Sequence, residues 1–144
     1  MTLKTLLITG SAVLAFAAAT VPAHAGNYLS LEQYGYANSL GSSQNGKRNR
    51  LTIYQDGYAN QAFGTQAGKN NRVVIGQEGR WNRADAAQTG RRNIAGIAQF
   101  GKGHSAITTQ DGHGNAIGVI QAGRGNHTNV TQIGRGNVSV IVQD

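Results

Sequence analysis

Apolar and polar residues alternate along this chain in an eleven-residue unit, Q-x-G-x-x-N-x-h-x-h-x, in which h marks a mostly apolar position. With glutamine numbered as position 1, positions 6, 8 and 10 and the next glutamine share one parity. An extended strand therefore places all four on one face. One such set is Asn49, Leu51, Ile53 and Gln55. A fixed period is typical of stacked units that cannot bury their apolar faces alone, so we predict one strand per unit.

Amide side chains occupy positions 1 and 6 of nearly every unit. The glutamines are Gln33, Gln44, Gln55, Gln66, Gln77, Gln88, Gln99, Gln110, Gln121, Gln132 and Gln143. The asparagines are Asn27, Asn38, Asn49, Asn60, Asn71, Asn82, Asn93, Asn115, Asn126 and Asn137, and His104 takes the asparagine position in one unit. Because these amides share a face with apolar residues, they are expected to point inward and to need hydrogen-bond partners. Ladders between stacked layers would supply those partners.

The residues between the strands are expected to turn the chain. Positions 2 to 5 contain a glycine at position 3, and glycine permits the positive φ that tight corners need. An eleven-residue period also fits a right-handed coiled coil. A glycine in every unit would cost such a helix roughly 1 kcal/mol each, and the i, i+2 apolar spacing favours strands.

Large and small inward residues alternate between successive units. The large pairs include Leu51/Ile53 and Val73/Ile75, and the small pairs that follow them are Ala62/Gly64 and Ala84/Ala86. The structural repeat is therefore 22 residues, a strand–turn–strand arch of two 11-residue half-repeats. The expected fold class is all-β: a β-solenoid of parallel, in-register arches, about five and a half layers rising ~4.8 Å each.

The chain divides into an export segment and one domain. A short basic start at Lys4, an apolar stretch and a small-x-small motif before Gly26 indicate a secretory signal peptide at 1–25. The repeats form the predicted solenoid domain at 26–144. The chain contains no cysteine, so disulfides do not stabilise this secreted domain as they do many others.

Charge suggests acidic partners, since the formal net charge is +7 at pH 7. Position 4 is cationic in most units and gives the candidate polyanion contacts Lys47, Lys69, Arg80, Arg91, Lys102, Arg124 and Arg135. Stacked rows of cations could bind extracellular DNA or anionic polysaccharide through sequence-independent contacts. The same rows could instead serve to delay aggregation through like-charge repulsion, and the two roles are compatible.

Catalysis and metal binding find little support in the sequence. Asp56 and Glu78 share position 2 in successive layers and could lie ~5 Å apart, as in retaining glycosidases. The pattern offers no apolar pocket that would raise the pKa of one carboxyl. His104, His113 and His127 fall at unit positions 6, 4 and 7 and do not converge on one metal ion. We therefore expect no enzyme, no cofactor and no small-molecule substrate.

The segment 49–66, NRLTIYQDGYANQAFGTQ, resembles the curlin repeat of curli amyloid subunits, S-x5-Q-x-G-x-x-N-x5-Q, and the resemblance extends over 27–143. It implies an amyloid-forming subunit of cell-surface fibres in the biofilm matrix, secreted and active in adhesion and aggregation. The implied partners are further copies, other curli subunits and outer-membrane secretion machinery. Two features depart from the family. Asparagine replaces its leading serine, which should strengthen the ladder, and only Gly26 precedes the first strand where a Gly/Asn-rich leader is expected.

Two alternatives stay open at this point. The basic balance is more like a minor, nucleating subunit, whereas ending on a strand at Gln143 is more like the major one. A monomeric secreted solenoid that binds polysaccharide or a surface is the other alternative. Soluble arrays need polar terminal units, while the strand expected at 138–143 is apolar and its edge can template another chain. A fibre subunit is therefore the favoured interpretation over a monomeric solenoid.

Overall fold

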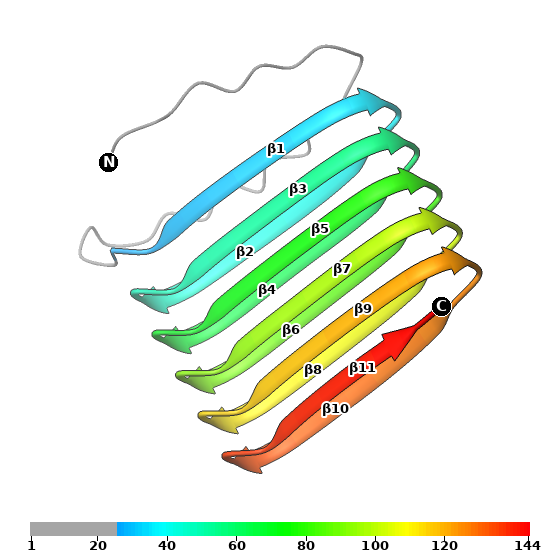
Figure 1. The fold of residues 1–144 in the computed structure, drawn as a ribbon. Coiled ribbons are helices and arrows are strands. Elements are labelled where there is room, and N and C mark those ends of the chain that lie inside the picture. The colour runs from blue at the N-terminus through cyan, green and yellow to red at the C-terminus, as the bar shows by residue number, and fades with distance from the viewer. Residues whose placement is uncertain (1–25) are drawn as a thin grey trace.

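The computed structural model describes residues 26–144, so the predicted signal peptide at 1–25 lies outside the described residues. The described chain winds into a flattened solenoid of strands and short corners (Figure 1). The strands are β1 (Tyr28–Tyr36), β2 (Ser39–Lys47), β3 (Arg50–Tyr58), β4 (Gln61–Lys69), β5 (Arg72–Arg80), β6 (Arg83–Arg91), β7 (Ile94–Lys102), β8 (Ser105–His113), β9 (Ala116–Arg124), β10 (His127–Arg135) and β11 (Val138–Gln143). No segment within 26–144 forms a helix long and apolar enough to cross a membrane.

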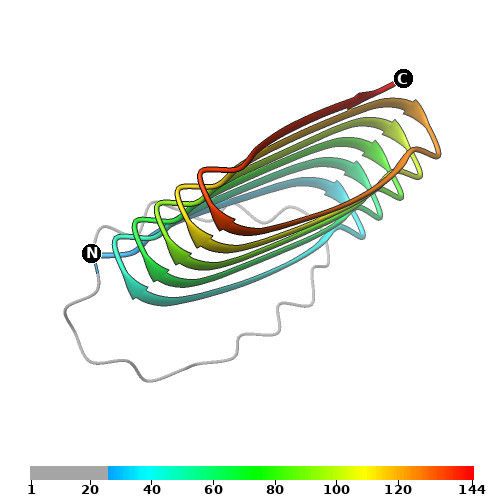
Figure 2. The same ribbon diagram turned by 90° about the horizontal axis from the view of Figure 1, so that it is seen from below.

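Two parallel sheets form the broad walls of the solenoid. One, the odd sheet, has the order β1-β3-β5-β7-β9-β11, and the other, the even sheet, has the order β10-β8-β6-β4-β2. Every strand pairs in register with the strand 22 residues away, so that Leu51 lies beside Val73 and Gln55 beside Gln77. Seen from below, each turn is a narrow loop that leads into the next turn (Figure 2). The predicted fold class, a β-solenoid with a 22-residue repeat, is confirmed.

A thin core fills the space between the sheets because large residues face small ones. Leu51, Ile53, Val73 and Ile75 of the odd sheet are fully buried. Opposite them, the even sheet contributes Ala62, Ala84, Ala86 and Ala106, also fully buried. At Gly64 an added Cβ would lie 2.6 Å from Leu51 Cδ1. The alternation of size read from the sequence thus matches the close packing of protein interiors.

The corners are shorter than the sequence suggested. Turns were expected at positions 2 to 5, but each full strand continues through position 4 and the chain reverses at positions 5 and 6. Position 5 has a positive φ in every corner. It lies between 52° and 58° in six non-glycine residues, Ala37, Arg48, Ala59, Asn70, Trp81 and Arg92, and between 68° and 73° in Gly103, Gly114, Gly125 and Gly136.

The glycine at position 3 lies inside the strand and meets the next layer directly. Gly79 has φ +116°, and a Cβ there would overlap the carbonyl oxygen of Gly101 one layer on. The expected positive φ is therefore present. A second constraint, close backbone approach, acts at the same residue and also requires glycine.

Candidate functional site

Inward glutamines join consecutive layers through their side-chain amides. Gln55 Nε2 donates to Gln77 Oε1 at 2.8 Å, and Gln77 Nε2 donates to Gln99 Oε1 at 2.7 Å. The odd-sheet ladder contains Gln33, Gln55, Gln77, Gln99, Gln121 and Gln143, and the even-sheet ladder contains Gln44, Gln66, Gln88, Gln110 and Gln132. Every one of these bonds runs from the earlier layer to the later one, so the ladders have a direction.

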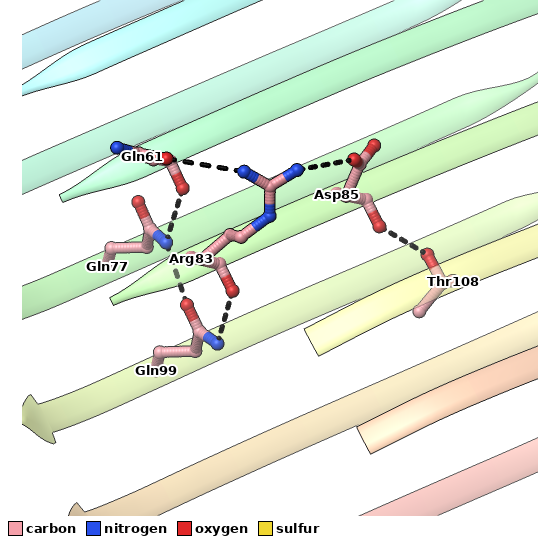
Figure 3. A network of polar contacts seen from close by, with 6 residues as sticks. All are labelled: Gln61, Gln77, Arg83, Asp85, Gln99 and Thr108. Carbon is pink, nitrogen blue, oxygen red and sulfur yellow. Dashed lines mark hydrogen bonds and ion pairs between the residues drawn. The ribbon is translucent and has the colours of Figure 1, made fainter. Parts of the chain in front are cut away.

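The second N–H of the amide ties the two sheets together. Gln77 Nε2 also donates to the backbone carbonyl of Gln61 at 2.9 Å, and Gln99 Nε2 donates to that of Arg83 at 2.9 Å. Figure 3 shows both amides reaching from the odd sheet to backbone oxygens of β4 and β6. Gln77 and Gln99 are fully buried. Such an amide uses both donors and its oxygen, which satisfies a polar group that burial would otherwise penalise.

Asparagines bind the backbone of the corners rather than one another's side chains. Asn71 Nδ2 donates to the carbonyls of Ala67 and of Gly90 in the next layer, at 3.2 and 3.1 Å. Its Oδ1 accepts the backbone N–H of Asn93 at 3.1 Å. Both donations also occur at Asn38, Asn49, Asn60, Asn82, Asn93 and Asn115.

The remaining asparagines make part of this pattern. Asn126 and Asn137 donate to the carbonyl four residues earlier, and Asn27 accepts the backbone N–H of Asn49. A serine hydroxyl has one donor, whereas the amide has two. Asparagine can therefore bind its own corner and the next layer at once, which explains its fit at position 6.

His104 stands in the asparagine position with one bond fewer. Its Nδ1 accepts the backbone N–H of Asn126 at 3.2 Å, and its Nε2 lies 3.1 Å from the carbonyl oxygen of Phe100. The accepting role of Nδ1 places the proton on Nε2. The ring thus has a single donor, and it is spent on its own corner, while the side chain is 1% exposed.

Replacing His104 by asparagine is expected to stabilise the solenoid by about 1 kcal/mol, because the amide would add a donation to the carbonyl of Gly123 in the next layer. Urea unfolding of freshly purified monomer would measure the change. The control is His127→Asn, since His127 is exposed at the start of β10. An unchanged or lower free energy of unfolding for His104→Asn would show that the second donation carries no weight.

Cationic side chains line both edges of the solenoid. The corner that follows the odd strands carries Arg80, Lys102 and Arg124 in neighbouring layers. A groove of about 460 Å³ runs beside them along the glycines of position 3. The opposite corner carries Lys47, Lys69, Arg91, His113 and Arg135 in consecutive layers. The strand register thus gathers the candidate polyanion contacts into two vertical rows.

One of these rows also contains an aromatic residue that was not among the site residues predicted from the sequence. Trp81 is half exposed at position 5 of the odd corner. Lys102 Nζ lies 4.7 Å from the ring centroid and the Arg80 guanidinium 5.4 Å from it, both within cation–π range. Tyr58 contacts the same ring edge-on. The sequence did contain a signal for this contact, because Trp81 at position 5 directly follows the cationic position 4.

The carboxylate pair considered for catalysis lies on a solvated surface. Asp56 and Glu78 are neighbours in register on β3 and β5, and both side chains are exposed. Partial burial, together with these two carboxylates, raises the pKa of the Tyr54 hydroxyl nearby. An exposed carboxyl keeps its hydration, so this pair lacks the desolvation that general acid catalysis uses. His104 sits at a buried corner, His113 in a cation row and His127 at the start of a strand.

Comparison with known protein families identifies the repeat. The curlin associated repeat family matches residues 46–79, 82–112 and 105–134. Together these segments cover more than half of the 144-residue chain and lie across β3 to β10. No curated protein matches the chain.

Proposed function

Because the chain belongs to the curlin associated repeat family, we propose that it is a structural subunit of extracellular, curli-type amyloid fibres. In this role it polymerises with further copies of itself in a biofilm matrix and supports adhesion and aggregation. The signal peptide predicted at 1–25 supports export. Other curli subunits and an outer-membrane secretion apparatus are the partners that the family suggests.

One observation carries the proposal: the side-chain bonds of both glutamine ladders all run from the earlier layer to the later one. Gln77 accepts from the preceding layer through Oε1 and donates to the following layer through Nε2. Asn71 donates forward to Gly90 and accepts the backbone N–H of Asn93 through Oδ1. One side of a layer is therefore the complement of the other side of any similar layer.

Complementary opposite sides favour growth by translation. A contact between two different surfaces of the same molecule generates an open filament when the operation does not close. Exposed strand edges supply the backbone donors and acceptors for the addition. A filament built this way would continue the 22-residue register of the solenoid from one chain to the next.

Polymerisation can be tested with purified polypeptide of residues 26–144. Under the proposal, quiescent incubation yields thioflavin-positive fibres with a ~4.8 Å reflection along the fibre axis, and preformed seeds remove the lag. A β-rich monomer that persists for days at high micromolar concentration would instead favour a soluble, surface-binding solenoid. Acceleration of fibre growth by trace amounts, without incorporation along the fibres, would favour the nucleating role.

The cationic corners support a second activity of the same fibre, the retention of polyanions. Each layer adds a charge to a row, and the layers rise by ~4.8 Å. Such closely spaced cations repel one another, and a polyanion relieves that repulsion while it releases its own counterions. DNA and acidic polysaccharide share the required chemistry, a regular line of negative charge.

Preformed fibres are expected to retain DNA of any sequence, with retention that falls steeply between about 50 and 500 mM NaCl because binding depends on counterion release. Replacement of the seven cations at position 4 by glutamine should abolish retention while fibres still form. The substituted residues are Lys47, Lys69, Arg80, Arg91, Lys102, Arg124 and Arg135. Retention by co-sedimentation at each salt concentration is the measurement.

A matched pair of triple variants separates position from net charge. Glutamine at Lys47, Lys69 and Arg91 removes three cations from one corner, whereas glutamine at Arg50, Arg72 and Arg83 removes three from strand faces. Only the corner triple should weaken retention strongly. Equal loss in both triples would assign binding to overall charge and not to the rows.

A further inference from the structure

The outer surface of the odd sheet is formed by positions 7, 9, 11 and 2 of its strands, and we call it the odd face. Its side chains support a contact beyond the end-to-end growth of the fibre. The inference about this contact rests on that proposed growth. We propose that the odd face binds the odd face of a second copy, so that filaments pair side by side. The layers of the two copies lie in register, with facing strands antiparallel.

A two-fold axis parallel to the stack defines this pairing. When the axis passes over position 10 of each odd strand, position 7 of one copy lies opposite position 2 of the other, and position 9 lies opposite position 11. Such a contact is isologous, because the same patch serves both partners. The proposal therefore requires every odd strand to be complementary to itself about its own centre.

The charged layers meet this requirement. β3 begins with Arg50 and has Asp56 two residues before its end at Tyr58, so each arginine would face the partner's carboxylate. β5 repeats the arrangement with Arg72 and Glu78. All four side chains are exposed, and the ion pair found within residues 26–144 is between Arg83 and Asp85 on the even sheet. The arginines and carboxylates of the odd face are thus available to a partner.

The apolar layers are complementary to themselves because a large side chain lies opposite a small one. At positions 9 and 11, β5 has Val74 opposite Gly76, and β9 has Gly118 opposite Ile120. A large side chain of one copy would therefore enter the space above a glycine of the other. A groove of about 260 Å³, lined by Val74, Gly96, Ala98, Gly118 and Ile120 among others, already hollows this part of the face.

The glycines of the odd face have no role within the single chain. A Cβ added at Gly76 or Gly118 would meet nothing within 4 Å, and one at Gly96 would only touch a backbone oxygen at 4.0 Å. None of the three has a positive φ. Glycine inside a strand weakens it and often marks the close approach of another backbone. A second odd face is a flat surface of the same ~4.8 Å periodicity that could approach in this way.

The even sheet lacks this symmetry. Its outward positions include Arg83, Asp85, Thr109, Asn129 and Thr131, and Asp85 at position 9 has Ala87 at position 11.

The area of the odd face is large enough for a stable interface. Strands of ~30 Å stacked over ~26 Å give about 800 Å² per copy, which is the usual contribution of each partner to a stable interface. A polyanion would find alternating charges and an apolar half there instead of a cationic row.

A charge swap tests the pairing. Mass per unit length of fibres, measured by scanning transmission electron microscopy, should equal at least two chains per ~26 Å of rise in the unmodified protein. Arg50→Glu with Arg72→Glu places like charges opposite each other and should lower it at least twofold, to a single filament. Adding Asp56→Arg and Glu78→Arg should restore the original value. Arg48→Glu with Arg92→Glu makes the same change in net charge at the corners and should leave it unaltered.

A second variant probes the apolar half. Gly118→Lys enters open space in the single chain and should also give single filaments, whereas Thr109→Lys on the even sheet should not. Single filaments in the unmodified protein, or a swap that fails to restore pairing, would overturn the inference while leaving fibre formation intact. Absence of thioflavin-positive fibres in the unmodified protein would overturn the proposed function and, with it, the pairing.

Discussion

The Gly79→Ala variant is expected to lose at least about 3 kcal/mol of unfolding free energy, a large part of the total stability of a domain this size. Gly79 has φ +116°, a conformation that residues with a Cβ rarely adopt, and its Cβ would overlap the carbonyl oxygen of Gly101. The obstacle is backbone, which cannot rotate away as a side chain can. Relief requires two layers to separate, and that breaks the strand register on which β5 and β7 depend.

The matched control lies in the same strand. Gly76→Ala adds the same methyl group at an ordinary φ where nothing lies within 4 Å. That variant should be as stable as the original protein or slightly more so, because alanine restricts the unfolded chain. Denaturant unfolding of both monomers gives the comparison. Similar stabilities for the two variants would mean that the layers are not stacked as closely as described.

Gln77→Leu is expected to destabilise the solenoid by about 3 kcal/mol although leucine fills a similar volume. The change leaves Gln99 Oε1 and the carbonyl of Gln61 without their donor, and it removes the acceptor of one Gln55 N–H. Each buried polar group left unpaired costs ~1–3 kcal/mol. Gain of apolar burial by leucine offsets only part of this loss.

Gln61→Leu provides the control for that experiment. The Gln61 side chain is exposed, and its Oε1 accepts a bond of 3.3 Å from Arg83 (Figure 3). Its loss should change the unfolding free energy by less than about 0.5 kcal/mol, as is usual at surfaces. If the two leucine variants unfold alike, the inward amides do not hold the layers together.

Much of the fold could be read from periodicity because one repeat serves every layer. The parity of Asn71, Val73, Ile75 and Gln77 assigns an inward face, and the spacing of 22 residues between large pairs assigns the sheet register. Parallel stacking then follows, since only the strands 22 residues before and after a given strand match it in side-chain size and amide position. The rows of corner cations follow from the same register.

The corners could not be derived in this way. A positive φ at Trp81 or Arg92 carries no sequence signal, because these residues rarely adopt it and do so here only where ten corners repeat one backbone path. Glycine is required at position 3 for two independent reasons, its positive φ and the close approach of the next layer. The sequence suggests only the first. The contact with the next layer appears once the arches are stacked. The backbone bonds of asparagine depend on the same stacking.

In the proposed fibre the solenoid persists, so that successive layers come from one chain. A nitroxide label at a single cysteine tests it, since the native chain has no cysteine. Thr109 is exposed at an outward position of β8 and suits the label. In a stack of solenoids, equivalent labels in neighbouring chains are separated by at least five layers, about 24 Å.

Electron paramagnetic resonance of Thr109→Cys fibres therefore decides the matter. The solenoid fibre predicts a spectrum without exchange narrowing and a dipolar distance of about 24 Å or more. An in-register cross-β fibre with one strand per chain in each layer would place the labels ~4.8 Å apart. It would collapse the spectrum to a single exchange-narrowed line, and that result would contradict the account.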